Sequence, residues 1–475
     1  MQAEHDKASQ ALQPGHQILK TRDDHQPLEL QPTETEKLSD RQFQLKTGHQ
    51  SSWLKPDAHF GPEKLRPRIE PWLTALVQAE HLSLLVGSGL THAVHYIAKN
   101  QTLPGMEVPS FEPFDATIAS HAESAAEKAG RSPGNFEDQV RVANELLRGM
   151  EILETSKLCS FTEQHTSQQL REVLQGVLET FAEGILAGEQ ALITAPKRQR
   201  EHAFNYLVSF LMSFASRTGT RERLQLFTTN YDRYIEAGAD AAGLRLIDRF
   251  VGSIAPLFRA SRLAIDLHYN PPGIRGEPRY LEGVAQFTKL HGSLDWLDHQ
   301  GSIRRIGLPF GSTSLAPYLD TPSVEGATTR HLMIYPNAAK DRETAAYPYV
   351  ELFRDFAASI CRPNSVLFCY GYSFGDEHIN RVIEDMLTIP SSHLIIISYD
   401  DPLGRIMKFY EDVGRHHQLT LMLGDHLGNL PALVDHYLPK PAIDRTTFRM
   451  AELLRARWGG TEPKPEESPE NDGGA

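Results

Sequence analysis

Short, continuous apolar runs that alternate with helical patterns constrain the fold of this chain more than any other feature. Such runs are typical of strands buried on both faces of a parallel sheet. The candidate strands lie at 82–86, 224–228, 286–290, 332–335, 365–370, 394–398 and 419–423. Amphipathic helical patterns lie at 345–360, 377–387 and 402–413. The alternation predicts an α/β fold with a Rossmann-like, doubly wound parallel sheet.

The connection between the first two candidate strands is too long for a single crossover. It contains three further stretches with the periodicity of amphipathic helices, at 136–153, 167–186 and 202–214. We therefore expect a large helical insertion over residues 110–220. Such an insertion would cover the ligand cleft or form an oligomer contact.

Both ends of the chain are polar. Residues 1–60 are rich in Gln, His, Lys and Glu, and burial of their few large apolar side chains cannot offset the entropy lost on ordering. We expect a disordered or extended arm over 1–60 and one folded domain over 61–442. A C-terminal helix and a disordered, Pro- and Glu-rich tail are expected over 443–475.

The bulk composition narrows the class of protein. The 475 residues are 40% hydrophobic and 23% charged, as in soluble globular proteins, and the formal net charge is -13. This acidic balance argues against direct nucleic-acid binding. No apolar stretch approaches the ~18 residues of a membrane span, and no signal peptide is visible. Cys159, Cys361 and Cys369 form neither a disulfide framework nor a metal-ligand pattern. We expect a cytoplasmic protein with no metal and no membrane partner.

Polar side chains follow two of the candidate strands. Thr229, Asn230 and Asp232 come directly after one strand, and His291 follows the next. The carboxyl ends of parallel strands meet at one edge of the sheet, where ligands bind. Asn230 suits holding a ribose or a water, and His291 titrates near neutral pH and suits a general base. Each has a structural alternative, namely a turn residue for Asn230, a helix cap for Asp232 and a satisfied side chain for His291.

Glycine-bearing turns follow two other candidate strands. One is Gly87-Ser88-Gly89-Leu90-Thr91, and the other is Gly371-Tyr372-Ser373, with Asp376 placed as a helix N-cap behind it. Glycines let the backbone approach a phosphate, and the N–H groups of a helix start favour an anion. His92 stands where the dinucleotide fingerprint has its third glycine. For each of the two segments, the alternative is a tight turn that binds no ligand.

Together these segments resemble the sirtuin family. The family's Gly-Ala-Gly-Ile-Ser turn is similar to Gly87-Ser88-Gly89-Leu90-Thr91, and its Asn-x-Asp element to Asn230-Tyr231-Asp232. Its catalytic His-Gly is similar to His291-Gly292, and its later Gly-x-Ser turn to Gly371-Tyr372-Ser373. The resemblance spans roughly residues 80–400.

One difference from the family indicates which of its subgroups this chain resembles. Sirtuin deacylases carry a four-cysteine zinc module, which the three cysteines of this chain cannot build. The chain more closely resembles sirtuin-like proteins of bacterial anti-phage defence, which hydrolyse NAD. The string from Lys289 to Trp296 and the stretch 371–377 are similar to that group.

The resemblance implies an NAD hydrolase, which converts NAD to nicotinamide and ADP-ribose. It implies Asn230 and His291 as catalytic residues. The residues implied to bind NAD are Gly87, Ser88, Gly89, Thr91, Thr229, Asp232, Gly371 and Ser373. We also expect a homo-oligomer, and the resemblance implies a second defence component, in some systems a HerA-type ATPase. The chain has no Walker A pattern, so such an ATPase would be a separate protein.

Two other functions fit the same residues. One is ADP-ribosyl transfer to a protein or nucleic acid at the same site. The other is a nucleotide-sensing regulatory subunit without catalysis. The combination of Asn230, Asp232 and His291 speaks against a sensor, because a sensor needs no base.

Overall fold

A computed structural model describes residues 12–21, 24–33, 42–55, 58–103, 109–128, 136–156, 165–217, 222–260, 267–269, 279–281, 283–319, 321, 324–333 and 347–440. The C-terminal helix and tail expected over 443–475 lie outside these residues. So does Cys159.

The centre of the protein is a ten-stranded sheet with the order β3-β2-β1-β16-β15-β14-β4-β5-β11-β6. Neighbouring strands from β16 to β6 are all parallel. The strands of this part are β4 (His81–Val86), β5 (Leu224–Thr228), β6 (Arg245–Ile247), β11 (Val284–Lys289), β14 (Ser365–Tyr370), β15 (His393–Ser398) and β16 (Leu419–Leu423). The predicted Rossmann-like, doubly wound sheet is confirmed, because β4, β5, β11, β14, β15 and β16 follow the Rossmann order 3-2-1-4-5-6.

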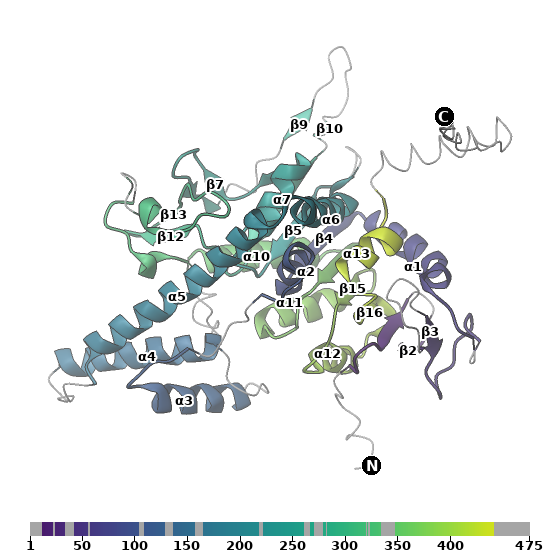
Figure 1. Ribbon diagram of the computed structural model, residues 1–475, viewed down its shortest axis with the longest axis horizontal. Coiled ribbons are helices and arrows are strands. Elements are labelled where there is room, and N and C mark those ends of the chain that lie inside the picture. Colours follow the sequence, from purple (N-terminus) through teal and green to yellow (C-terminus); the bar gives the residue numbers. More distant parts are fainter. Residues whose placement is uncertain are drawn as a thin grey trace, which may run out of the picture. The chain divides into compact units, whose positions relative to one another are not determined.

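Helices cover both faces of this sheet (Figure 1). One core lies under α1 (Pro62–Val77), α2 (Ser88–Lys99), α6 (Lys197–Ala215), α7 (Tyr234–Ala242) and α13 (Leu430–Ala432). The other lies under α10 (Tyr349–Ile360), α11 (Glu377–Leu387) and α12 (Arg405–Val413). Along β4, Leu84 and Val86 point into the first core and Leu85 into the second. This alternation explains why the parallel strands read as unbroken apolar runs.

The N-terminal arm is extended but not disordered where the structure describes it. Strands β1 (Gln17–Lys20), β2 (Leu28–Pro32) and β3 (Phe43–Leu45) continue the sheet in antiparallel pairing beyond β16. The expectation of disorder is wrong for these residues, because a few well-spaced apolar side chains suffice to cover the sheet edge. Leu19, Leu30 and Phe43 are fully buried. The buried amide of Gln17 is also satisfied, since its Oε1 accepts hydrogen bonds from the backbone N–H groups of residues 426 and 427 at 3.0 Å.

The helical insertion is smaller than predicted. Helices α3 (Asp115–Lys128), α4 (Phe136–Thr155) and the first half of α5 (Ser167–Thr194) share a core of their own, and Figure 1 shows them side by side, away from the sheet. Helix α6 instead packs its apolar face on the sheet. The predicted boundary of 110–220 is therefore too wide at its end. The start of α5 is fixed by a capping box in which Thr166 and Gln169 exchange hydrogen bonds.

The predicted strand at 332–335 is wrong in its described part, since Leu332 makes only an isolated bridge to Leu297. A second, four-stranded sheet was not predicted; its strands are β7 (Phe250–Val251), β8 (Leu257–Phe258), β12 (Trp296–His299) and β13 (Ser302–Arg305). These strands are too short and too mixed in polarity to stand out. The described residues also include a two-stranded sheet of β9 (His268–Tyr269) and β10 (Arg279–Tyr280). A short helix, α8, spans Ala316–Leu319. Among the described helices, none combines the length and the apolarity that crossing a membrane requires.

Candidate active site

The two glycine turns meet where the strand order reverses, between β4 and β14. The backbone N–H of Gly87 donates to the carbonyl of Tyr370 at 3.0 Å, and that of Gly89 to the carbonyl of Gly371 at 3.1 Å. A Cβ atom on Gly87 would lie 2.4 Å from the Gly371 oxygen, and one on Gly89 would lie 2.5 Å from the Gly371 Cα. Gly371 itself has φ +60°, which favours glycine. All three glycines are therefore required for close backbone packing.

This packing changes the role expected of Gly89. Its N–H is used by Gly371, and Gly89 does not line the adjacent cavity. The sequence resemblance grouped it with residues that bind NAD, but in the structure it shapes the turn. Gly87, Ser88 and Thr91 from the same segment do line the cavity.

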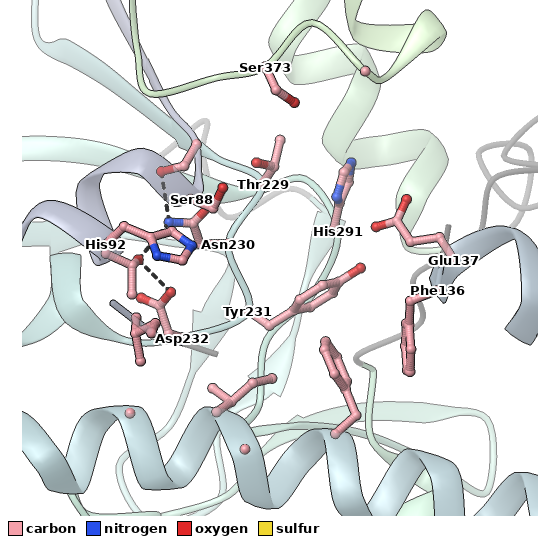
Figure 2. Close-up of a pocket in the computed structure, with 18 of the residues that line it drawn as sticks. Ser88, His92, Phe136, Glu137, Thr229, Asn230, Tyr231, Asp232, His291 and Ser373 are labelled. Carbon is pink, nitrogen blue, oxygen red and sulfur yellow. Dashed lines mark hydrogen bonds between the residues drawn. The ribbon is translucent and has the colours of Figure 1, made fainter. Parts of the chain in front are cut away.

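The cavity has a volume of about 880 Å³, which lies in the range of about 300–1,000 Å³ typical of small-molecule sites. It opens at the switch point of the sheet, where α/β folds bind their ligands. Apart from Gly89, the structure brings every predicted site residue to this cavity, namely Gly87, Ser88, Thr91, Thr229, Asn230, Asp232, His291, Gly371 and Ser373. Figure 2 shows Asn230, Thr229 and His291 around one space.

Asn230 is held by a short hydrogen-bond network at the end of β5. Its Nδ2 donates to the Gly87 carbonyl and to Thr91 Oγ1, both at 3.0 Å, and its backbone N–H donates to Thr228 Oγ1 at 3.1 Å. Both amide hydrogens are thus used within the protein. The side chain can offer a ligand only its Oδ1 oxygen, an acceptor suited to a hydroxyl or a water.

Asp232 belongs to the same hydrogen-bond network as an acceptor. Its Oδ2 accepts a hydrogen bond from Thr91 Oγ1 at 2.7 Å, and its Oδ1 accepts one from the backbone N–H of Tyr234 at 3.1 Å. The second contact is a turn that precedes α7 and not a helix cap, because the N-cap of α7 is Arg233 and the helix has no side-chain cap. Asp232 therefore positions Thr91, which in turn positions Asn230.

His291 is paired with a carboxylate from a distant part of the chain. Its Nε2 lies 2.8 Å from Asp376 Oδ2, and the two side chains are each 8% exposed. Asp376 Oδ1 also accepts from the backbone N–H of His378 at 3.0 Å, which makes Asp376 the N-cap of α11 as predicted. A carboxylate partner fixes the orientation and tautomer of an imidazole ring. The sequence indicated the cap but not this pairing.

The helical insertion forms the opposite wall of the cavity. Phe136 and Phe181 stack at 4.7 Å between ring centroids, and Phe181 meets Tyr231 edge-on at 5.8 Å. Tyr231 in turn lies 6.3 Å from the His291 ring. Figure 2 shows Glu137, at the start of α4, with its carboxyl group turned toward the side where His291 lies. The insertion thus adds an aromatic wall and an acidic group that motif reading missed.

The face of α5 that borders the cavity carries Gly176, Gly184 and Gly188. Their spacing of eight and four residues places them on one side of the helix. A stripe of small residues on one helix face is the signal that could have indicated this wall.

The described lining of the cavity contains more acidic than basic side chains. Among the described residues that line it, Arg405 at the start of α12 is the one arginine or lysine, and it lies beside Gly375. Asp232, Asp376 and Glu137 supply the carboxylates. Burial lowers the pKa of His92, which also lines the cavity, while Asp232 and Asp400 act in the opposite direction.

Among the described residues that line this cavity there is no cysteine. Cys369 is fully buried in β14, and burial raises the pKa of its thiol. Within the ranges that the structure describes, no group of three or more His, Cys, Asp or Glu side chains gathers in a way that could hold a metal ion.

Comparison with known proteins bears on the same segments. Residues 225–416 match the family model of the SIR2-like domain. The match begins at β5 and includes Asn230, His291, Gly371 and Asp376, but not the turn after β4 or the helical insertion. It supports the resemblance to sirtuin-like proteins and suggests a function that depends on NAD. No curated protein matches the chain.

Proposed function

We propose that this protein is an NAD glycohydrolase, which splits NAD into nicotinamide and ADP-ribose. The observation that carries the proposal is the convergence of Asn230 and the His291–Asp376 pair on one cavity at the switch point of the sheet. The SIR2-like match supports NAD as the substrate.

In the proposed reaction the bond between the ribose C1′ and the nicotinamide nitrogen breaks, and nicotinamide leaves as a neutral molecule with the bonding electron pair. The oxygen of a water molecule bonds to C1′ and gives up a proton. His291 takes that proton, directly or from a ribose hydroxyl, and Asp376 orients the imidazole and stabilises its protonated form. The proton then passes to solvent.

The remaining groups hold the substrate and stabilise the charge that develops. Oδ1 of Asn230 accepts a hydrogen bond from the ribose or from the attacking water. The carboxylate of Glu137 stabilises the oxocarbenium-like sugar by its negative charge. Arg405 and Ser373 face the diphosphate, since a guanidinium group and a hydroxyl are suitable partners for phosphate oxygens. The aromatic wall of Phe136, Phe181 and Tyr231 contacts the nicotinamide end.

Transfer of ADP-ribose to a protein or nucleic acid is the competing use of the same site. We favour water as the acceptor, because α4 and α5 line the cavity beside His291 and narrow the approach for a macromolecule. Mass spectrometry separates the two outcomes. Hydrolysis gives ADP-ribose in solution, whereas transfer gives a mass increase on the acceptor.

We further propose that NAD depletion serves anti-phage defence, as the resemblance implies, in a homo-oligomer with a separate HerA-type ATPase or another defence subunit. Co-expression with candidate partners followed by size-exclusion chromatography tests this assembly. Phage challenge of cells that carry the parent or the His291→Ala variant tests the defence role. Equal protection by both would contradict it.

The catalytic proposal is tested by incubating purified full-length protein with NAD and measuring nicotinamide. General-base removal typically costs about 10²–10⁴-fold in rate, so His291→Ala should lose nicotinamide release by that factor. Asp240→Asn is the matched control, because Asp240 is exposed on α7 and does not line the active-site cavity. It should retain the parent rate.

A further inference from the structure

The order of the strands indicates which part of the active-site cavity faces each half of a dinucleotide. In the Rossmann order β14 is the first strand, β15 the second and β4 the fourth. A dinucleotide lies across the crevice at the switch point, with one nucleotide on each half of the sheet. Asn230 and His291 follow β5 and β11 on one half, so the reacting nicotinamide end belongs there. The adenosine end would therefore lie past β14 and β15.

The turn after β14 suits the diphosphate that joins the two nucleosides. A Cβ atom on Gly375 would lie 2.8 Å from Arg405 Nη1 and 3.5 Å from Ser373 Oγ, so both side chains border this turn. All three residues line the cavity. A guanidinium group and a hydroxyl are suitable partners for phosphate oxygens. In this fold the ribose that follows the diphosphate lies at the end of the second strand, where an acidic residue binds its hydroxyls.

Asp400 stands just past the end of β15. Its backbone carbonyl accepts a hydrogen bond from Ser398 Oγ at 2.8 Å, but no described residue donates one to its carboxylate. The side chain is exposed, so the carboxylate is open to a ligand. It lies beside His92 of the cavity lining, since burial lowers the pKa of His92 and Asp400 opposes that shift. Asp400 is not itself part of the lining, so a ribose bound to it would lie at the margin of the cavity.

Asp401, the neighbouring acidic residue, has a structural role. It is buried, and its carboxylate accepts hydrogen bonds from the backbone N–H groups of Ile406 at 3.2 Å and Met407 at 3.0 Å. This use by α12 leaves Asp400 as the accessible acid of the loop. Tyr399 and Leu403 on the same loop are 54% and 58% exposed, and such apolar side chains suit packing against a planar base.

We propose that Asp400 binds the adenosine ribose of the substrate, accepting hydrogen bonds from its 2′- and 3′-hydroxyls, and so selects NAD over NADP. The 2′-phosphate of NADP replaces a hydroxyl donor and adds about 1.5 to 2 negative charges beside the carboxylate. Loss of the hydrogen bond and repulsion between like charges both disfavour NADP. The inference rests on the proposed function, since it names the substrate class of the same site. Asp400 acts in substrate choice, because the bond that breaks lies on the other half of the sheet.

Binding and turnover are measured separately. Isothermal calorimetry compares ADP-ribose with ADP-ribose 2′-phosphate on the purified full-length protein, and neither ligand needs hydrolysis to bind. We expect the parent to bind ADP-ribose at least about tenfold more tightly, as for a hydrogen bond to a charged group. Asp400→Asn should reduce this preference by about tenfold. With NAD as substrate, the same variant should raise KM and leave kcat nearly unchanged.

Asp412→Asn is the matched control. Asp412 is exposed on α12 and does not line the cavity. The variant therefore makes the same charge change away from the site and should keep the parent preference. Circular dichroism establishes that each variant is folded.

The inference is overturned if the parent binds both ligands equally, if folded Asp400→Asn keeps the parent preference, or if Asp412→Asn loses it to the same extent. Failure of the proposed function gives a different result. NAD would then be bound and left intact, while the preference for ADP-ribose and its loss in Asp400→Asn remained. A parent that binds neither ligand would overturn both proposals.

Discussion

His291 Nε2 and Asp376 Oδ2 lie 2.8 Å apart, although their strands β11 and β14 are separated in the sheet by β5 and β4. The contact forms because both residues stand just past the carboxyl ends of their strands, on the ligand-binding edge. It joins the two halves of the doubly wound sheet, and both residues line the cavity. The same carboxylate caps α11, so the orientation of the His291 ring is tied to a helix terminus.

The substitution Asp376→Asn distinguishes two roles of Asp376, its pairing with His291 and its capping of α11. Asparagine caps a helix as well as aspartate does, so we expect the free energy of unfolding to stay within about 0.5 kcal/mol of the parent. Nicotinamide release should fall, because a neutral amide does not stabilise the protonated imidazole. The decrease should appear in kcat with little change in KM. Measurement of kcat and KM against pH, together with urea unfolding, tests both parts.

Gly89→Ala should disrupt the junction of the two glycine turns. The new methyl would lie 2.5 Å from the Gly371 Cα, and backbone atoms cannot move aside cheaply. We expect a loss of about 1–3 kcal/mol in the free energy of unfolding, as for overpacking. Gly149→Ala in α4 is the control, since nothing lies within 4 Å of its added Cβ. It should gain roughly 0.5–1 kcal/mol. Equal effects of the two substitutions would contradict this view of the junction.

Glu236 gives the stability a pH dependence of known sign. Burial raises its pKa from 4.5 to about 7 in the folded protein, with Lys289 opposing and Asp295 adding. Between these values the folded state binds more protons than the unfolded state, so its stability falls as pH rises. Glu236→Gln cannot titrate and should flatten the curve in that window. Urea unfolding across the window measures this, and identical curves for parent and variant would count against the assignment.

An ion pair between Glu189 and Arg233 connects α5 to the segment that carries Asn230 and Asp232. Glu189 is fully buried in α5, and its carboxylate pairs with Arg233, the residue directly after Asp232. Removing one partner leaves a buried charge without compensation, so Glu189→Gln should cost about 3–5 kcal/mol of stability. Glu201→Gln is the control, because Glu201 pairs with Lys197 on the exposed surface of α6. Its unfolding midpoint should not change measurably.

The sequence allowed prediction of the sheet and of the part of the cavity lining that follows its strands. Parallel strands buried on both faces leave unbroken apolar runs, and residues that follow such runs meet at one edge whatever the detailed topology. For this reason Asn230, His291 and Gly371 could be grouped from the sequence. The roles of these residues in catalysis stay predictions.

Contacts that depend on tertiary structure could not be predicted in this way. The pairing of His291 with Asp376 needs the order of the strands, which no local pattern specifies. In strands β1–β3 the few apolar residues are separated by polar ones, so no apolar run marks these strands in the sequence. The burial of Gln17 depends on hydrogen bonds from the backbone N–H groups of a distant loop. Gly89 matches a phosphate-binding motif but is explained by a backbone contact to a turn almost three hundred residues away.

The most direct test of the central claim follows the products of NAD by proton NMR, using the purified full-length parent, Asn230→Ala and His291→Ala. We expect the parent to form nicotinamide and ADP-ribose in equal amounts. Both variants should bind NAD. His291→Ala should lose about 10²–10⁴-fold in rate, and Asn230→Ala should also be slower because it lacks the oxygen that holds the ribose or the water. Unchanged product formation by either variant, or NAD bound by the parent and left intact, would contradict the central claim.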